Sequence, residues 1–345
     1  MPRRKSTKPT LKDVAAAAKV SAQTVSFVVN NNPVITPETR ERVLDAIRML
    51  GYTPNASARS LRSGQSRVLG LLIPDAHNPH FWSILDGAEQ EALADGYSLV
   101  VATTAMEKKR ERRSFDALTR QHLAGLILLL TFPEDFCEDI ALLARKNIPI
   151  VVDGQQFERV DRVWFHYRPA ARELMDHLIG LGHRRIAFIQ GVGRQDHSAG
   201  RDRADVYAQK MAEIGVPEVE RRIELCGSTL EEGFHAAQRI LETAPDTTAI
   251  VGMNDLIAYG AIQAAHLAGL KVPQDLSVAG FDDDEIFRFS SPSLTSGRVD
   301  GSEFGAKAVR LIFSRLESPD LAPQKAHVPS RLVIRQSTGP VRTPA

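Results

Sequence analysis

The sequence predicts an all-α helix-turn-helix head, a hinge, and a two-lobed α/β core with parallel sheets. Three observations lead to this fold class. Residues up to about 53 contain helix start and stop signals and no strand pattern. From Val68 onward, short apolar runs alternate with helical segments, which is typical of parallel sheets covered on both faces. The 345 residues also exceed one typical domain of roughly 100–200 residues.

The head is predicted to contain three short helices with clear boundary residues. The first two are joined by a tight turn, and this is the helix-turn-helix pattern. The second helix should bury three valines and leave its polar side exposed. In chain order the signals are the Thr10–Asp13 capping box, the Lys19-Val20 turn, the N-cap Ser21, the buried Val25, Val28 and Val29, the Thr36-Pro37 start of the third helix and its Gly51 end.

The core is predicted to hold roughly ten strands, too many for one small α/β unit, so two similar lobes are expected. In parallel sheets ligands bind beyond the carboxyl ends of the strands. Polar residues directly after strands are therefore candidates for binding a ligand. They are Asp75, Asn78, Asp153, Arg201, Asn254, Asp255, Asp282 and Asp283.

Charge is distributed unevenly along the chain. The net charge is +1, but residues 1–64 hold eleven Lys/Arg and four Asp/Glu, which leaves the head at +7 and the remainder at −6. A basic head on an acidic body indicates that the head meets a polyanion. The alternative is a solvated basic tail, because Arg3, Arg4, Lys5 and Lys8 lie at the terminus.

Composition excludes several classes of protein. The two cysteines, Cys137 and Cys226, lack metal-ligand spacing and are expected to be buried reduced thiols. The basic start is not followed by an apolar signal region, and no apolar run approaches the 18 residues of a membrane span. We therefore expect a cytoplasmic protein with no membrane partner.

Six segments together resemble the lac-repressor (LacI/GalR) family of bacterial transcriptional regulators. The resemblance covers nearly the whole chain, from Thr10 to about Gly339, and depends on the order and spacing of the segments rather than on the head alone. The segments are TLKDVAAAAKVSAQTVSFVVN, TRERVLDAIRMLGYTPNASARSLRSGQS, IPDAHNPHF, LIGLGHRRIAFIQG, NDLIAYGAIQAAHLAGLKVPQDLSVAGFDD and PSLTSGRVD.

The resemblance implies a domain plan. A DNA-binding domain (residues 8–53) is followed by a hinge helix or linker (54–66) and by an effector-binding and dimerisation core (67–345). The core resembles periplasmic sugar-binding proteins, with a first lobe at about 67–165 and 297–324 and a second lobe at about 166–296 and 325–341. A homodimer would bind a pseudo-palindromic operator in double-stranded DNA, with a small effector between the lobes and no cofactor or metal.

The second helix of the head should lie in the major groove. Its outward residues are Ala22, Gln23, Ser26, Phe27 and Asn30, while Thr10, Ser21 and Thr24 are candidates for phosphate contacts. Gln23 can bond an adenine edge. Phe27 departs from the family, which usually has arginine there; it can contact a thymine methyl but cannot bond guanine. Two interpretations of Phe27 stay open, a base contact or packing against the head itself.

The hinge contains one large apolar residue, Leu61, which matches the family's minor-groove leucine. Paired hinge helices of that family insert such leucines into a base step and bend the DNA. Asn55, Arg59 and Arg62 accompany Leu61 in the hinge set. The segment is too short to be a stable helix alone, so we expect it to fold on DNA. The alternative is an unstructured linker with an incidental leucine.

Family matching places the effector among eight residues: Asp75, Asn78, His80, Phe81, Asp153, Arg201, Asn254 and Asp282. Carboxylates, amides and a guanidinium suit a hydroxyl-rich ligand. Structural alternatives remain, because Asn254 can cap the next helix, Phe81 can belong to the core, and Asp282 can be part of a solvated acidic cluster. His166 and Tyr167 stand where the family usually has an Asp-Asn pair.

The predicted function is a dimeric DNA-binding regulator, a repressor controlled by a sugar or sugar derivative. The alternative within this class is a corepressor-activated regulator that senses a nucleoside or base. An enzyme using FDDDE at 281–285 is disfavoured because no phosphate loop, nucleophile elbow or His-x-x-x-His pattern accompanies that segment. A solute-binding protein without a DNA role is disfavoured by the basic head and the missing signal region.

Overall fold

The computed structural model describes residues 9–29, 32–52, 66–154, 157, 159–191, 198–217 and 222–341. The chain divides into two compact units, Met1–Ser66 and Arg67–Ala345. In these described ranges, no helix combines the length and the apolar character needed to cross a bilayer.

The head consists of three helices, α1 (Leu11–Ala18), α2 (Ala22–Val29) and α3 (Pro37–Leu50). Their boundaries confirm the predicted signals. The Thr10 hydroxyl and the Asp13 carboxylate form both halves of a capping box, and Lys19 ends α1 in the left-handed conformation with φ 53°. Thr36 caps α3, and Gly51 ends it at φ 61°.

Seven buried residues form the core of the head: Val14, Ala15, Ala18, Val25, Val28, Val43 and Ala46. The predicted burial of the α2 valines is confirmed for Val25 and Val28, and Val29 packs half-buried against them. Arg40 of α3 donates a hydrogen bond from Nη2 to the carbonyl oxygen of Asn32 at 2.7 Å. This contact ties α3 to the loop that follows α2 and so helps to fix the orientation of α2.

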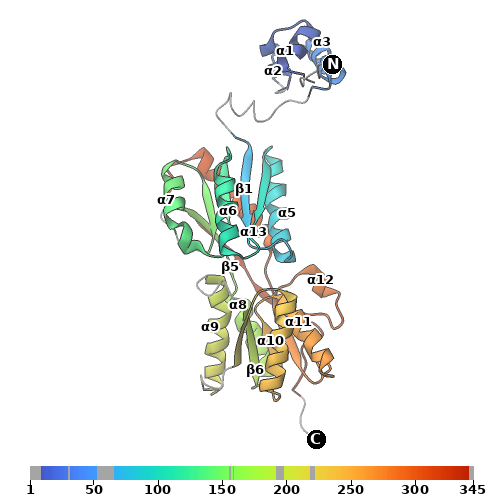
Figure 1. Ribbon diagram of the computed structural model, residues 1–345, viewed down its shortest axis with the longest axis vertical. Coiled ribbons are helices and arrows are strands. Elements are labelled where there is room, and N and C mark those ends of the chain that lie inside the picture. Colours follow the sequence, from blue (N-terminus) through green and yellow to red (C-terminus); the bar gives the residue numbers. More distant parts are fainter. Residues whose placement is uncertain are drawn as a thin grey trace, which may run out of the picture. The chain divides into compact units, whose positions relative to one another are not determined.

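The first lobe is built on a six-stranded parallel sheet with the order β11-β5-β4-β3-β1-β2. Adjacent residues of β1 lie in different clusters, with Leu71 in one and Leu72 in the other, because neighbouring side chains point to opposite faces. Helices α5 and α13 pack together on one face, and α6 and α7 cover the other (Figure 1). The elements are β1 (Val68–Ile73), α5 (Pro79–Ala94), β2 (Ser98–Thr103), α6 (Lys108–Thr119), β3 (Gly125–Leu128), the short 3-10 helix η1 (Pro133–Phe136), α7 (Cys137–Arg145), β4 (Ile150–Asp153), β5 (Asp161–His166), α13 (Gly301–Glu317) and β11 (Lys325–Pro329).

The second lobe repeats this plan with the strand order β12-β10-β9-β8-β6-β7. All its pairs are parallel except β10 with β12, which run antiparallel. The parallel-sheet prediction therefore holds for both lobes with this one exception. The elements are α8 (Arg168–Gly180), β6 (Ile186–Gly191), α9 (Ser198–Glu213), β7 (Arg222–Cys226), α10 (Leu230–Thr243), β8 (Ala249–Gly252), α11 (Asp255–Leu267), β9 (Ser277–Asp282), α12 (Glu285–Arg288), β10 (Thr295–Arg298) and β12 (Arg331–Val333).

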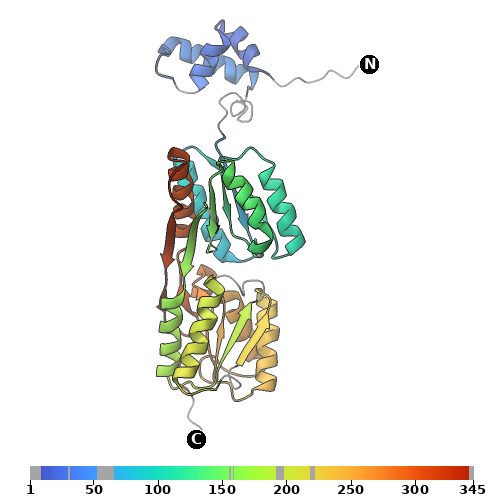
Figure 2. The ribbon, with the colours of Figure 1, turned by 90° about the vertical axis from the view of Figure 1, so that its left-hand side faces the viewer.

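Three segments connect the lobes (Figure 2). The chain leaves the first sheet after β5, returns between β10 and α13, and crosses again between β11 and β12. Strand β11 belongs to the first sheet, whereas the lobe boundary expected from the sequence lay before it, at residue 324. Three crossings at one side allow the lobes to change their angle without unfolding.

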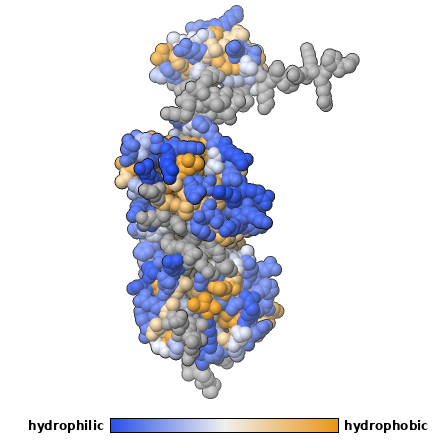
Figure 3. Space-filling view, turned by 60° about the vertical axis from the view of Figure 1, so that its left-hand side comes forward, coloured by the Kyte–Doolittle hydropathy of each residue, from blue (hydrophilic) through white to orange (hydrophobic). Residues whose placement is uncertain are grey.

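One of the two cysteines lies at the surface of the core. Cys226 is buried, but Cys137 is exposed at the start of α7, so the expectation of two buried thiols was wrong for Cys137. Its position on the outward side of the first turn of α7 explains the difference. On the face shown in Figure 3, hydrophilic side chains cover most of both lobes, and apolar ones gather in small separate patches.

Candidate functional site

Helix α2 presents a compact outward face. Ala22 and Gln23 are exposed, while Ser26 and Phe27 are half-buried. Ser21 caps the helix, because its Oγ accepts a hydrogen bond from the backbone N–H of Thr24 at 3.0 Å. The two hydroxyls of this pair also lie 2.9 Å apart. Gln23 is not a partner in these two contacts, and its side chain is exposed.

Of the other residues predicted to contact DNA, the structure describes only some. Thr10 is exposed at the start of α1 with its hydroxyl donating to Asp13 at 2.7 Å, so its capping role is realised. Asn30 and the hinge residues Asn55, Arg59, Leu61 and Arg62 lie outside the described residues.

A narrow cavity of about 20 Å³ lies between the two lobes of the core. Both lobes contribute to its wall, at the carboxyl ends of their strands, where parallel sheets bind ligands. Five of the eight predicted effector residues are present, namely Asn78, His80, Phe81, Asn254 and Asp282. The remaining lining residues are Met106, Tyr167, Arg203, Ser228 and Met253.

A buried trio of Tyr167, Arg203 and Asp282 occupies the centre of this cavity. The Tyr167 hydroxyl donates a hydrogen bond of 2.5 Å to Oδ1 of Asp282. The Arg203 guanidinium stacks on the Tyr167 ring at 4.0 Å and lies 3.8 Å from the same carboxylate oxygen. Arg203 is only 4% exposed, and its Nε has no hydrogen-bond partner among the residues that the structure describes. The guanidinium therefore keeps donor capacity for a ligand.

Backbone conformation directs the polar groups into the cavity. Asn78 and Asn254 cap α5 and α11, and their side chains accept the N–H groups of His80 and Ile257. The capping alternative for Asn254 is thus realised, although Asn254 also lines the cavity. Asp282 ends β9 with φ 103°, a conformation that L-residues rarely adopt and that commonly occurs at functional sites.

Three predicted effector residues do not line the cavity. Asp75 is buried and accepts the backbone N–H of His77 at 2.9 Å, and Asp153 is buried at the end of β4. Arg201 lies on the exposed side of α9, whereas Arg203 faces the cavity two residues later. His166, at the end of β5, is also outside the lining, whereas the neighbouring Tyr167 is part of it.

Arg203 could have been found from helix periodicity. It shares the buried face of α9 with Val206 and Tyr207, which follow it by three and four residues. An arginine on an apolar helix face must have a specific partner, because burying an unpaired charge is costly. Both arginines follow strand β6, so a position after a strand does not distinguish Arg201 from Arg203.

Behind Asp282 lies a second layer of buried carboxylates. Ser296 Oγ donates to Asp255 at 2.7 Å, and the backbone N–H of Asp284 donates to Asp255 at 2.9 Å. Burial, with the charges of Asp284 and Asp282 adding to it, raises the pKa of Asp255 well above its usual value. Asp283 is instead surrounded by cations, with Arg335 Nη2 at 2.6 Å. The first four residues of the FDDDE segment, 281–284, are therefore buried, and the solvated-cluster alternative for Asp282 was wrong.

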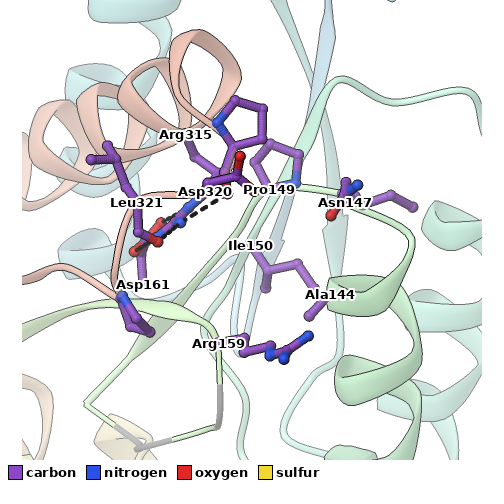
Figure 4. Close-up of a pocket in the computed structure, with 12 residues that line it drawn as sticks. Ala144, Asn147, Pro149, Ile150, Arg159, Asp161, Arg315, Asp320 and Leu321 are labelled. Atoms are coloured by element: carbon purple, nitrogen blue, oxygen red, sulfur yellow. Dashed lines mark hydrogen bonds and ion pairs between the residues drawn. The ribbon is translucent and has the colours of Figure 1, made fainter.

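A separate depression of about 370 Å³ lies at the opposite end of the first sheet, before β4 and β5 (Figure 4). Arg315 donates to both carboxylate oxygens of Asp161, at 2.6 and 3.2 Å, and to carbonyl oxygens of the following loop, including Leu321. Its donors are thus used to fix residues 318–324 on the sheet. Because it faces the amino ends of the strands, this depression is not the predicted effector site.

Comparison with known proteins agrees with this geometry. Residues 10–55 match the family described as bacterial regulatory proteins, lacI family, and residues 175–338 match a periplasmic binding protein-like domain. The HTH-type transcriptional regulator DegA of Bacillus subtilis (strain 168) is 34% identical over 340 residues, which cover 97% of this chain and 100% of DegA.

This chain belongs to the LacI family of bacterial regulatory proteins. A ribose operon repressor of Halalkalibacterium halodurans is 33% identical over 95% of the chain and 97% of its own length. A lac repressor dimer bound to operator and the anti-inducer ONPF superposes with a TM-score of 0.83, at 27% identity over 96% of this chain and 100% of that chain.

Membership of the LacI family establishes the broad function. Like these LacI-family relatives, the protein is a DNA-binding transcriptional regulator with an effector-binding core, and the enzyme alternative is set aside. The helix-turn-helix head and the two-lobed core are the parts that the family uses for these two tasks.

Proposed function

We propose that this LacI-family regulator is a cytoplasmic repressor that binds a pseudo-palindromic operator as a homodimer and responds to a sugar or sugar derivative between its lobes. The observation that supports the effector site is the buried Arg203–Tyr167–Asp282 trio in the inter-lobe cavity. A buried guanidinium, a carboxylate and two amide side chains provide both donors and acceptors, which is what a ligand with several hydroxyls requires.

Tyr167 explains how ligand binding would change the lobes. Its hydroxyl uses Oδ1 of Asp282, and the cavity of about 20 Å³ has room for about one water molecule. A sugar needs several times this volume. Its entry would therefore displace the Tyr167 hydroxyl and increase the separation of the lobes, so that ligand affinity depends on the lobe angle.

A nucleoside or base remains the second candidate class. The apolar side chains Met106 and Met253 line the cavity beside Phe81, and a flat heterocycle could lie against them. Phe81 is 2% exposed and belongs to the main core cluster, so it offers an edge and not a free stacking face. This favours a hydroxyl-rich ligand over a flat one.

The DNA contacts are proposed on the family resemblance together with the exposure of α2. Ala22, Gln23, Ser26, Phe27 and Asn30 would face the major groove, and Thr10, Ser21 and Thr24 the phosphates. Leu61, with Asn55, Arg59 and Arg62, would form the minor-groove hinge.

The effector site is tested with two arginines of one helix. Thermal unfolding of the full chain is measured against a panel of sugars, sugar phosphates, nucleosides and bases. A ligand at 100 times its Kd stabilises the folded state by about 2.7 kcal/mol. We expect Arg203→Gln to remove the shift that the active compound produces, because Arg203 is the buried cation of the cavity.

Arg201→Gln is the matched control, since Arg201 is exposed on the same helix. It should keep the full shift, and both variants should bind operator in a gel-shift assay without ligand. A shift retained in Arg203→Gln and lost in Arg201→Gln would move the effector site away from the cavity.

A further inference from the structure

A second cleft, of about 660 Å³, shares His80 and Asp282 with the effector cavity. The first lobe contributes α5, and the second lobe contributes the turn from β9 into α12, while the segment that crosses from β10 to α13 forms the floor. Apart from His80 and Asp282, its lining residues have no part in the effector cavity described above.

The free charge of the cleft is negative. Its two arginines are already committed to the buried Asp283 carboxylate, with Arg288 Nη2 at 3.3 Å and Arg298 Nε at 3.6 Å. Arg288 also donates to the Asp283 carbonyl oxygen at 2.7 Å. The other acidic lining residues are Asp86, Asp282, Asp284, Glu285 and Asp300.

Asp284 is the least satisfied of these carboxylates. Asp284 is 8% exposed, and its Oδ2 is buried without a hydrogen-bond partner in the described part of the chain. Burial raises the pKa of Asp284 to about 8, with the charges of Asp282 and Asp283 adding to this and Arg288 opposing it. A cation bound to the Asp284 carboxylate would favour its ionised form.

An aromatic platform lies in the same cleft. Trp82 on α5 is 55% exposed, which is unusual for so large a side chain. Its Nε1 donates to the carbonyl oxygen of Ala76 at 3.0 Å, so one edge of the indole is fixed while the ring remains accessible. An indole face attracts organic cations through its quadrupole.

We propose that this cleft is a second ligand site, which binds a small organic ammonium ion between the Trp82 indole and the Asp284 carboxylate. Such an ion satisfies both features at once, since its N–H groups donate to carboxylates and its CH₂ groups pack on the ring. The described residues contain no group of His, Cys, Asp and Glu arranged to hold a metal ion, which favours an organic cation over a metal. Because α5 and the β9–α12 turn belong to different lobes, occupancy would bias the lobe angle.

The test is calorimetric titration of the full chain with n-butylammonium chloride and with 1,4-diaminobutane dihydrochloride at constant ionic strength, beside n-butanol as the neutral analogue. We expect saturable binding of the amines, none of n-butanol, and a change in tryptophan fluorescence. Asp284→Asn and Trp82→Leu should each weaken amine binding at least about tenfold, which corresponds to about 1.4 kcal/mol.

Two further variants keep the test decisive. Asp86→Asn changes an exposed carboxylate of the cleft, hydrogen-bonded by Gln90 of the same helix, and it should weaken amine binding by a smaller factor. Asp320→Asn, in the depression at the far end of the first sheet, should leave binding unchanged. No saturable amine binding, or equal affinity in wild type, Asp284→Asn and Trp82→Leu, would overturn the proposal. The Arg203 test of the sugar-type site is unaffected by either result.

Discussion

Phe27 is the residue of α2 that we expect to have the clearest effect on the preferred operator sequence. It is half-buried and not part of the buried core of the head, so part of its ring is available for contact. Arginine at this position would bond guanine, whereas a phenyl ring favours a thymine methyl, and one good base contact is worth about 1–3 kcal/mol of discrimination. We therefore expect Phe27→Arg to change the preferred base at one position of each half-site to guanine.

The measurement is selection of operator sequences from a random DNA library by wild type and variant. Gln23→Ala serves as a comparison, because it should relax a different position of the half-site. If wild type already selects guanine at the position that Phe27→Arg changes, Phe27 does not make the proposed contact and packs against the head instead.

The residues of the effector cavity show which parts of a site a sequence can specify. The position after a strand and the family resemblance predict Asn78 and Asn254, and both line the cavity. The same two signals predict Arg201, whereas Arg203, on the buried face of α9, lines the cavity. Tyr167 was noted only as a departure from the family, and its bond to Asp282, 115 residues away, depends on how the two lobes close.

At the scale of elements, the packing of helix pairs depends on glycines where two backbones meet. A Cβ on Gly305 of α13 would lie 2.0 Å from the carbonyl oxygen of Ile84 on α5. A Cβ on Gly260 of α11 would likewise lie 2.3 Å from the carbonyl oxygen of Leu230 on α10. The order of strands and helices followed from the sequence, but these close approaches did not, because a glycine in a helix has the same local pattern whether its surroundings are crowded or open.

This crowding gives a prediction for α13. Gly305→Ala should lower the unfolding free energy of the core by about 1–3 kcal/mol, because the contact is with backbone atoms that cannot rotate away. Gly180→Ala is the matched helical control, since no atom lies within 4 Å of its added Cβ. It should be neutral or raise stability by up to about 1 kcal/mol. Denaturant unfolding of both variants checks this, and equal stabilities would contradict the close α5–α13 contact.

At the scale of the whole molecule, the edge strands of the two sheets suggest how two copies associate. Strand β2 ends the first sheet and exposes Val101, and β7 ends the second and exposes Ile223 and Leu225, the last at 50%. An exposed edge strand with apolar side chains readily pairs with or packs against another chain. A repressor that binds two half-sites must be a dimer, and we infer that these edge strands belong to its interface.

Leu225→Glu should therefore shift the protein from dimer toward monomer in sedimentation equilibrium. Operator affinity should fall at least tenfold. In a dimer, binding of one head makes binding of the second half-site an intramolecular step, whereas a monomer binds a single half-site. Leu142→Glu on α7 is the control, since Leu142 is also 50% exposed but lies on a helix away from either edge strand. Ligand-induced stabilisation should persist in both variants, because the inter-lobe cavity lies within one chain. A Leu225→Glu protein that remains dimeric would place the interface on another surface of the core.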